Sequence, residues 1–373
     1  MKCIDHILPF QSPGNQRSLT SWHFGQAGAR PRVYLQAGLH ADELPGILVA
    51  QYLRQSLEQL EQAGLIKGEI VLVPVANPIG LSQFHQGQHH GRFEGVSGRN
   101  FNRGFPDLVA AAAAMLESQL SDNPESNQAL VRQALRQALA AQSCASELDA
   151  LQSTLFGLAL DADVVLDLHC DSQAAMHVYA HSDQLESANA LGAYLGACAI
   201  LHASEQGGQS FDDACTRQWW QLRKQFSDHP IPFGCFAATV ELRGQADVDA
   251  GLAQQDVANL IAFLTWAGAI TAQADPLSPP ALRYPATPLV CVEVLVAPIA
   301  GVVVYHSEVG AMVHAGELVG ELVDPLSGLS YPLRCSQDGM YYARVAHRYA
   351  QAGTELCFIA GQVPQRRTHL LAT

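Results

Sequence analysis

The order of apolar and amphipathic segments early in the chain constrains the fold more than any other feature. Residues 32–39 (RVYLQAGL) form a short, largely apolar run, which is typical of a buried strand. Pro45 opens a helical pattern that closes at Gly64, the usual placement of these two residue types at helix ends. Residues 69–76 (EIVLVPVA) form a second apolar run. Strand, helix and strand in this order predict a βαβ unit, and therefore an α/β fold with a mainly parallel sheet flanked by helices.

Later segments continue this pattern. Residues 163–168 (DVVLDL) and 239–242 (TVEL) predict two more buried strands, and residues 176–180 are a further candidate. Between them, residues 108–160 are rich in Ala, Leu and Gln, so we expect a helical insertion over about 107–160 with a polar break near 121–127.

The segment from Gly80 to Pro106 is polar, rich in Gly and His, and shows little periodicity. It predicts a long loop, and long loops inside compact domains usually serve function.

The last quarter of the chain has a different character. Residues 275–288 are rich in Pro, Ser and Ala, which favours a linker, and short β-type runs follow. We therefore expect a hydrolase domain over residues 1–280 and a small β-domain over 288–373. The glycine and valine spacing of this tail resembles the biotinyl/lipoyl barrel-sandwich fold. Lys224 is the last lysine in the sequence, so the tail has no residue to which such a cofactor could be attached.

Composition limits the classes of function. A chain of 373 residues is expected to form two domains, and 48% hydrophobic and 15% charged residues are ordinary for a globular protein. The formal net charge of −14 argues against a nucleic-acid partner.

Three features indicate where in the cell the protein is found. The nine cysteines show no C-x-x-C pair, no membrane-length apolar run occurs, and no signal peptide is indicated at the N-terminus. We expect a cytoplasmic protein with reduced thiols that does not bind membranes.

Three residues form a candidate metal centre. His40 and Glu43 stand where the first predicted strand gives way to the first helix, and His169 follows another predicted strand in Asp167-Leu168-His169. Loops at the carboxyl ends of parallel strands are where α/β sheets place their sites. Two histidines and one glutamate are a ligand set of catalytic zinc, with one position left for water. A lone H-x-x-E would more often be a helix-start pair than a metal site.

Five short segments in a fixed order resemble the succinylglutamate desuccinylase/aspartoacylase family, which is related to the zinc carboxypeptidases. They are GLHADELPG, VANPIG, RNFNRGFPD, DLH and TVELRG, and they cover about the first three quarters of the chain. The resemblance implies that His40, Glu43 and His169 bind one zinc ion per chain. It also implies that Glu241 is the general base, which takes a proton from zinc-activated water.

The same resemblance assigns substrate-binding residues. Asn102 and Arg103 match the pair that grips a substrate carboxylate, and Arg92 matches the arginine that stabilises the oxyanion, with Arg99 as a competitor for that role. The sequence has Asn100 where the family usually has aspartate, which raises the question of how the Asn-Arg pair is held in place.

Each assignment has a structural alternative. Glu241 could simply pair with its neighbour Arg243 on a strand, and Arg103 could be a solvated loop residue. Asp167 could orient a ligand histidine or point to the opposite face of its strand. Four further residues near these motifs are left out of the metal centre: His85, His89, His90 and Cys170.

The leading interpretation is zinc-dependent hydrolysis of an amide bond in an N-acyl amino acid or a similar small substrate. A carboxypeptidase acting on a peptide is the nearest alternative, because it needs the same zinc, base and carboxylate clamp. A catalytically silent relative that binds a ligand or partner is the alternative from another class. The sequence leaves open the acyl group, the amino acid, the role of the β-domain and whether the protein forms a homo-oligomer.

Overall fold

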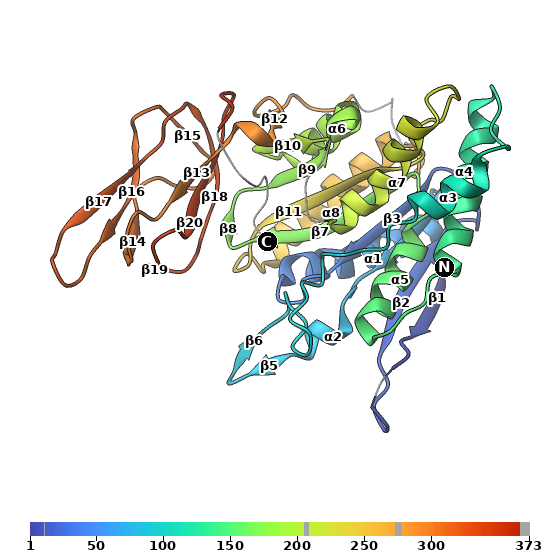
Figure 1. Cartoon of the computed structure of the whole chain (residues 1–373), viewed down its shortest axis with the longest axis horizontal. Helices are drawn as coiled ribbons and strands as arrows, with labels where there is room; N and C mark the ends of the chain where they lie inside the picture. Colours follow the sequence, from blue (N-terminus) through green and yellow to red (C-terminus); the bar gives the residue numbers. More distant parts are fainter. Residues whose placement is uncertain (11, 205–208, 273–277, 366–373) are drawn as a thin grey trace. The chain divides into compact units, whose positions relative to one another are not determined.

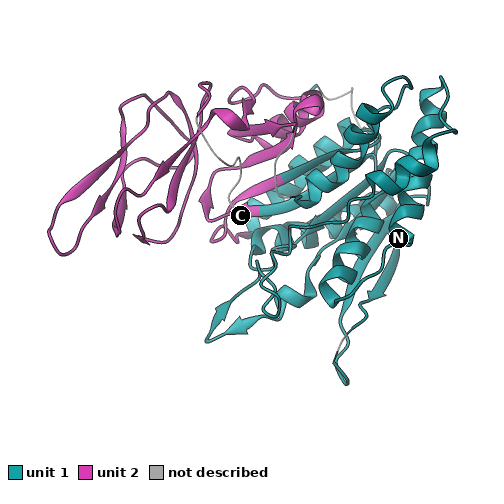
Figure 2. Ribbon diagram, in the orientation of Figure 1, with its two compact units in different colours: residues 1–169, 208–239, 250–278 teal, residues 170–207, 240–249, 279–373 magenta. Residues whose placement is uncertain are grey.

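The computed structural model describes the whole chain except residues 11, 205–208, 273–277 and 366–373. The chain divides into two compact units that interleave in sequence (Figure 2). Unit 1 comprises residues 1–169, 208–239 and 250–278, and unit 2 comprises residues 170–207, 240–249 and 279–373. The predicted division into a hydrolase domain over residues 1–280 and a β-domain over 288–373 stays a prediction. Residues 275–277 of the predicted linker lie outside the described residues.

Unit 1 contains strands in the order β1-β2-β4-β3-β7. β3 pairs in parallel with both β4 and β7, whereas β1 and β2 form an antiparallel edge. The sequence predicts the central strands, but not this edge. The strands are β1 (Lys2–Ile7), β2 (Ser18–Phe24), β3 (Arg32–Ala37), β4 (Glu69–Val73) and β7 (Val164–Asp171), the last of which ends in unit 2.

Helices flank these strands (Figure 1). α1 packs against β2, β3, β4 and α8, while α3, α4, α5 and α7 share one core with Tyr34, Val71, Val73 and Val165 of the sheet. The expected α/β fold with a mainly parallel, helix-flanked sheet is confirmed. The helices are α1 (Leu44–Gln62), α2 (Pro78–Leu81), α3 (Val109–Leu116), α4 (Pro124–Ala140), α5 (Glu147–Ala159), α7 (Phe211–Gln225) and α8 (Ala250–Trp266).

The segment predicted to be helical over 108–160 is interrupted twice, not once. The first break ends at Asn123, whose side chain accepts a hydrogen bond from the Ser126 N–H (2.8 Å) and so caps α4. The second break ends at Ser146, which caps α5 by accepting from the Asp149 N–H (3.1 Å). This second break has a less polar sequence than the first, so the composition alone did not predict it.

The segment predicted as a loop over residues 80–106 is mostly irregular, as expected. It also contains the end of α2 and a short hairpin of β5 (Phe84–His85) and β6 (Gln88–His89).

Unit 2 combines a small parallel group of strands with two antiparallel sheets. β9, β10 and β12 pair in parallel, and β9 corresponds to the strand proposed at residues 176–180. β11 (Phe236–Gly244), which contains the predicted strand 239–242, begins in unit 1 and ends in unit 2. The other elements here are β8 (Gln173–Ala174), β9 (His177–His181), η1 (Ser182–Gln184), α6 (Leu185–Leu195), β10 (Ala199–Ala203), β12 (Thr287–Pro288) and η2 (Leu289–Cys291).

The C-terminal strands form the antiparallel sheets, in the orders β13-β20-β18-β15 and β17-β16-β14-β19. Both sheets contribute to one core, which includes Val303 and Leu322 from one and Tyr341 and Ile359 from the other. The strands are β13 (Val292–Val296), β14 (Gly301–Tyr305), β15 (Ala311–Val313), β16 (Leu318–Val323), β17 (Ser330–Arg334), β18 (Gly339–Arg344), β19 (Tyr349–Ala350) and β20 (Glu355–Ala360).

The C-terminal sheets are expected to carry no covalently attached cofactor, because biotin and lipoyl groups are attached through lysine and none follows Lys224. Intact-mass spectrometry should therefore give the mass of the unmodified chain. An added mass equal to that of either cofactor would contradict this prediction.

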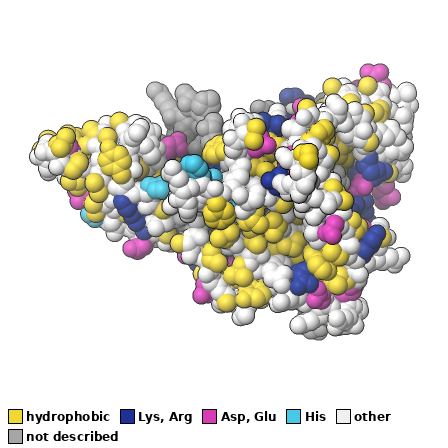
Figure 3. Space-filling model, turned by 90° about the horizontal axis from the view of Figure 1, so that it is seen from below, with side chains coloured by type: hydrophobic (Ala, Val, Ile, Leu, Met, Phe, Trp, Pro, Cys, Tyr) yellow, Lys and Arg dark blue, Asp and Glu magenta, His cyan; other side chains and the backbone are white. Residues whose placement is uncertain are grey.

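On the face drawn in Figure 3, Lys and Arg side chains lie at separate positions among neutral and acidic groups. Across the described residues, no helix combines the length and the apolar character needed to cross a bilayer.

Candidate active site

The candidate site begins where two adjacent parallel strands of unit 1 end. Gln36 and Ala37 on β3 lie beside Asp167 and Leu168 on β7, so the residues that follow both strands meet at one edge of the sheet. α1 starts very close to β7 there. A Cβ atom on Gly46 would lie only 2.8 Å from the Leu168 carbonyl oxygen, so glycine is required for this approach.

A tight turn brings His40 and Glu43 to the same side of the chain. The Glu43 N–H donates to the His40 carbonyl (3.1 Å), and α1 begins directly after Glu43, with Pro45 in its first turn. Residues of a neighbouring loop pack against this turn, because the Ala41 N–H donates to the Gly91 carbonyl (3.0 Å). Both side chains are buried: His40 is 3% exposed and Glu43 is 2% exposed.

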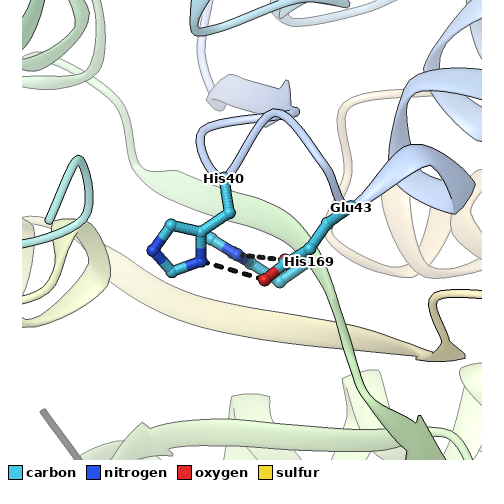
Figure 4. A group of neighbouring side chains, drawn as sticks. All are labelled: His40, Glu43 and His169. Carbon is cyan, nitrogen blue, oxygen red and sulfur yellow. Dashed lines mark hydrogen bonds and ion pairs between the residues drawn. The ribbon is translucent and has the colours of Figure 1, made fainter. Parts of the chain in front are cut away.

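The side chains of His40, Glu43 and His169 converge on one another (Figure 4). His40 Nδ1 lies 2.9 Å from Glu43 Oε1, and His169 Nδ1 lies 2.8 Å from Glu43 Oε2. Among the described residues, these three form a group whose potential ligand atoms all lie within 4.8 Å of one another. The structure therefore brings together the residues that the sequence singled out from segments more than 120 positions apart.

A buried hydrogen-bond chain lies behind His169. Its Nε2 is 2.9 Å from Asp167 Oδ2, so Asp167 orients the histidine and does not point to the opposite face. Gln36 donates from Nε2 to the other oxygen of Asp167 (3.0 Å), and the Tyr34 hydroxyl donates to Gln36 Oε1 (2.8 Å). Histidines that bind metals usually donate their second ring nitrogen to a carboxylate or carbonyl in this way.

His40 has an outer partner of a different kind. Its Nε2 lies 2.8 Å from the amide oxygen of Asn100, which also accepts a hydrogen bond from the backbone N–H of Asn102 (2.9 Å). Asn100, which stands where the family usually has aspartate, therefore holds the Asn102-Arg103 pair in place by connecting its backbone to the turn at His40.

The electrostatics of the three residues favour a bound cation. Burial by itself raises the pKa of the Glu43 carboxyl, but His40 and His169 outweigh it and hold that pKa well below its usual value. Burial lowers the pKa of His169, yet the carboxylates of Asp167 and Glu43 raise it well above the ordinary value. Burial lowers the pKa of His40, which favours its neutral, metal-binding form. The site thus stabilises positive charge beside the ionised Glu43 carboxylate and at His169. Nitrogen and oxygen donors of these types fit a zinc ion.

Of the two competing arginines, Arg92 reaches this group. Its Nη1 lies 3.1 Å from Glu43 Oε1 and 3.2 Å from His40 Nδ1. Arg99 instead donates to α5, to Asp149 Oδ1 (2.6 Å) and Gln152 Oε1 (3.1 Å). The structure therefore favours Arg92 for contact with a ligand at the site.

Asn102 and Arg103 lie between the candidate metal ligands and the start of α7. Asn102 Oδ1 accepts from the backbone N–H of Phe211 (2.8 Å), and its Nδ2 lies 3.4 Å from His169 Nε2. Arg103 is partly buried: burial and the nearby charge of Arg92 lower the pKa of its guanidinium, while Asp212 and Asp213 act in the opposite direction. Arg103 is thus a half-buried cation at the site and not a freely solvated loop residue.

Glu241 lies on the part of β11 that belongs to unit 2. It lies near Tyr179: burial, Tyr342 and the charge of Glu241 all raise the pKa of the Tyr179 hydroxyl. The loop histidines left out of the metal centre make other contacts, since His89 stacks on Phe84 with ring centroids 4.5 Å apart.

Sequence reasoning did not identify Gln36, Tyr34 or the double contact of Asn100 as parts of the site. The first two stand inside an apolar strand run, and only their position beside Asp167 reveals the buried polar chain.

A mainly parallel sheet with a buried His, Glu and His at the carboxyl ends of two adjacent strands defines an α/β protein with a candidate metal centre. The model of the succinylglutamate desuccinylase/aspartoacylase catalytic domain matches residues 29–266, and the chain belongs to this family. This confirms the resemblance seen in the sequence motifs.

Solved structures agree with this assignment. A succinylglutamate desuccinylase/aspartoacylase family protein from Shewanella amazonensis is 26% identical, with a TM-score of 0.82 over 96% of this chain and 98% of that one. A second, from Shewanella frigidimarina, is 25% identical, with a TM-score of 0.82 over 96% and 97% of the two chains. The ectoine utilization protein EutE (DoeB) from Ruegeria pomeroyi has the same fold at 15% identity, with a TM-score of 0.67 over 96% and 95%. No curated protein matches the sequence.

Proposed function

We propose that this protein is a zinc-dependent hydrolase that cleaves the amide bond of an N-acyl amino acid. Membership of the desuccinylase/aspartoacylase family supports a hydrolase. The observation that carries the proposal is the buried meeting of His40 Nδ1, His169 Nδ1 and both oxygens of Glu43. Burying two imidazoles and a carboxylate away from water costs free energy unless they are paired or bind a metal, and a metal ion would use all three groups at once.

Each part of the site has a proposed task. His40, Glu43 and His169 would hold the zinc ion, which when bound supplies a Lewis acid and lowers the pKa of a water molecule toward about 7. Glu241 is the proposed base: its carboxylate takes a proton from the attacking water and returns it to the nitrogen of the leaving amine.

The arginines are proposed to bind the charged parts of the substrate. Arg92, whose guanidinium lies at Glu43, would offset the negative charge that develops on the carbonyl oxygen. Asn102 and Arg103 would hold the substrate carboxylate, for which a planar guanidinium is well suited. A small acylated amino acid offers both groups, and this favours it over a neutral amide.

The metal is tested by loading and removal. The purified protein is expected to bind one zinc ion per chain and to lose hydrolytic activity on treatment with a chelator, with recovery on adding zinc. His169→Ala should abolish stoichiometric zinc binding, because it removes a ligand, whereas His89→Ala should not, because His89 stacks on Phe84 instead. Elemental analysis without zinc, and no uptake on titration, would rule out the metal.

The substrate class is tested by offering the zinc-loaded enzyme succinyl, acetyl and formyl derivatives of amino acids beside short peptides. Turnover of an N-acyl amino acid supports the proposal. Preference for peptides would make the protein a carboxypeptidase, and binding without turnover of any of them would make it a silent relative.

A further inference from the structure

We infer that Asn100 is a positioning residue that fixes the tautomer of His40 and thereby points His40 Nδ1 at the metal position. The same amide oxygen joins this ligand to the backbone of Asn102. The inference rests on the proposed metal centre, and it concerns a residue at which this chain carries an amide in place of the carboxylate usual in its motif.

The Asn100 amide has one orientation that its neighbours allow. Oxygen and nitrogen of an asparagine side chain are told apart by their partners. The backbone N–H of Asn102 can only donate, and it lies 2.9 Å from Oδ1 of Asn100. The reversed amide would place an NH₂ group against this N–H. The group at this position is therefore the oxygen.

The Asn100 oxygen determines which ring nitrogen of His40 carries the proton. Because the Asn100 oxygen is an acceptor and lies 2.8 Å from His40 Nε2, this ring nitrogen must donate. A neutral imidazole with its proton on Nε2 has a lone pair on Nδ1. Arg92 supports this independently, because its guanidinium can only donate and its Nη1 lies 3.2 Å from His40 Nδ1. The Glu43 carboxylate oxygen that lies 2.9 Å from Nδ1 is the third group there, and it is one of the atoms that a bound metal would share with the Nδ1 lone pair. The contacts with Asn100 and Arg92 thus specify the same tautomer for the metal-binding state.

Backbone hydrogen bonds hold Asn100 in place beside His40. The backbone of Asn100 pairs with Phe93 in an antiparallel bridge, and the Phe101 N–H donates to the Arg92 carbonyl (3.1 Å). The segment that contains Asn100 and the segment that contains Arg92 are therefore hydrogen-bonded to each other. Asn100 is 8% exposed and His40 is 3% exposed, so water cannot readily replace a lost hydrogen bond between them.

His169 has an outer partner with a different charge from that of His40. The outer partner of His169 is a carboxylate, Asp167, and that of His40 is a neutral amide. Both act as acceptors for Nε2, so both direct Nδ1 toward Glu43. The Asn100 amide orients His40 without adding a second negative charge to that of Asp167. The orientation of His40 therefore depends on the position of the Asn100 oxygen and not on a carboxylate charge.

The experiment measures the zinc dissociation constant by competition with a chelator of known affinity. Asn100→Leu keeps the approximate volume but removes the acceptor, and it should weaken zinc binding by about 10- to 100-fold, the usual effect of losing such an outer partner. Asn100→Asp keeps the acceptor and should bind zinc at least as tightly as the unmodified protein. Asn127→Leu is the matched control: Asn127 is also buried and bonded to backbone carbonyls, but at the start of α4, and its loss should leave zinc affinity unchanged.

Several results would overturn the inference. They are a zinc affinity of Asn100→Leu within threefold of the unmodified protein, an Asn100→Asp variant as weak as Asn100→Leu, and an equal loss in Asn127→Leu. Failure of the unmodified protein to bind zinc would overturn the inference together with the metal centre. A long-range ¹H–¹⁵N spectrum of the zinc-loaded protein should show the His40 proton on Nε2, and a proton on Nδ1 would also contradict it. Inactivity toward N-acyl amino acids, with these affinities as expected, would contradict the proposed function alone.

Discussion

Replacing Glu241 by glutamine is expected to lower kcat at least about 100-fold, the lower end of what a positioned proton transfer contributes. Glutamine has nearly the same shape, but its amide cannot accept a proton from the attacking water. The zinc content should not change, because the proposed ligands are His40, Glu43 and His169. The measurement is kcat on an N-acyl amino acid, with elemental analysis of the same sample.

A second glutamate of unit 2 provides the control. Glu293 is buried on β13 and accepts hydrogen bonds from the Ser336 N–H at 2.8 and 3.0 Å, a structural role. Glu293→Gln should therefore affect stability and not kcat. If Glu241→Gln keeps nearly the full kcat, the base lies elsewhere and Glu241 is a structural residue beside Arg243.

The βαβ core and the three candidate ligands could be predicted because their signals are local. An apolar run, a proline and a glycine suffice to place β3, α1 and β4, and a parallel sheet then brings the ends of β3 and β7 together. His40, Glu43 and His169 each stand directly after such an element. Their convergence follows from topology, without knowledge of any particular contact.

The support of the site could not be predicted, because it depends on contacts between distant residues. Asn100 meets His40 across 60 positions and Asn102 meets Phe211 across 109. Gln36 stands in an apolar strand, and its role depends on the register that places it opposite Asp167. Neither propensity nor hydrophobic period carries this information.

The interleaving of the two units is a similar case. Short segments 170–207 and 240–249 group with the C-terminal strands, although the linker-like composition near residue 280 suggests a simple division of the chain. A stretch rich in Pro, Ser and Ala indicates a linker, but amino-acid composition does not indicate which distant segments pack into the same core.

Arg103→Ala is expected to lower kcat/KM at least about 100-fold for an N-acyl amino acid, and to have little effect on the same compound with its carboxylate amidated. Loss of one partner from a charge-assisted pair in a partly dry site has effects of this size. The unmodified enzyme should already prefer the acid. The charges around Arg103 strengthen this expectation: Arg92 repels its guanidinium, while Asp212 and Asp213 stabilise it. Without Arg103, a substrate carboxylate would lie near Asp212 and Asp213 and would lose the guanidinium that offsets their charge.

Arg99→Ala separates this clamp from a general disturbance of the loop. Arg99 stands four residues from Arg103 and is hydrogen-bonded to Asp149 and Gln152 of α5, away from the candidate metal ligands. Arg99→Ala loosens the same loop without removing a proposed substrate-binding group. The variant should therefore show a small decrease in kcat/KM that is the same for the acid and for the amide. Arg103→Ala should instead change the ratio between the two substrates, because only the acid has a carboxylate to lose its partner. Equal losses for Arg103→Ala, or an unmodified enzyme that prefers the amide, would exclude Arg103 as a carboxylate clamp and with it the preference for acylated amino acids over neutral amides.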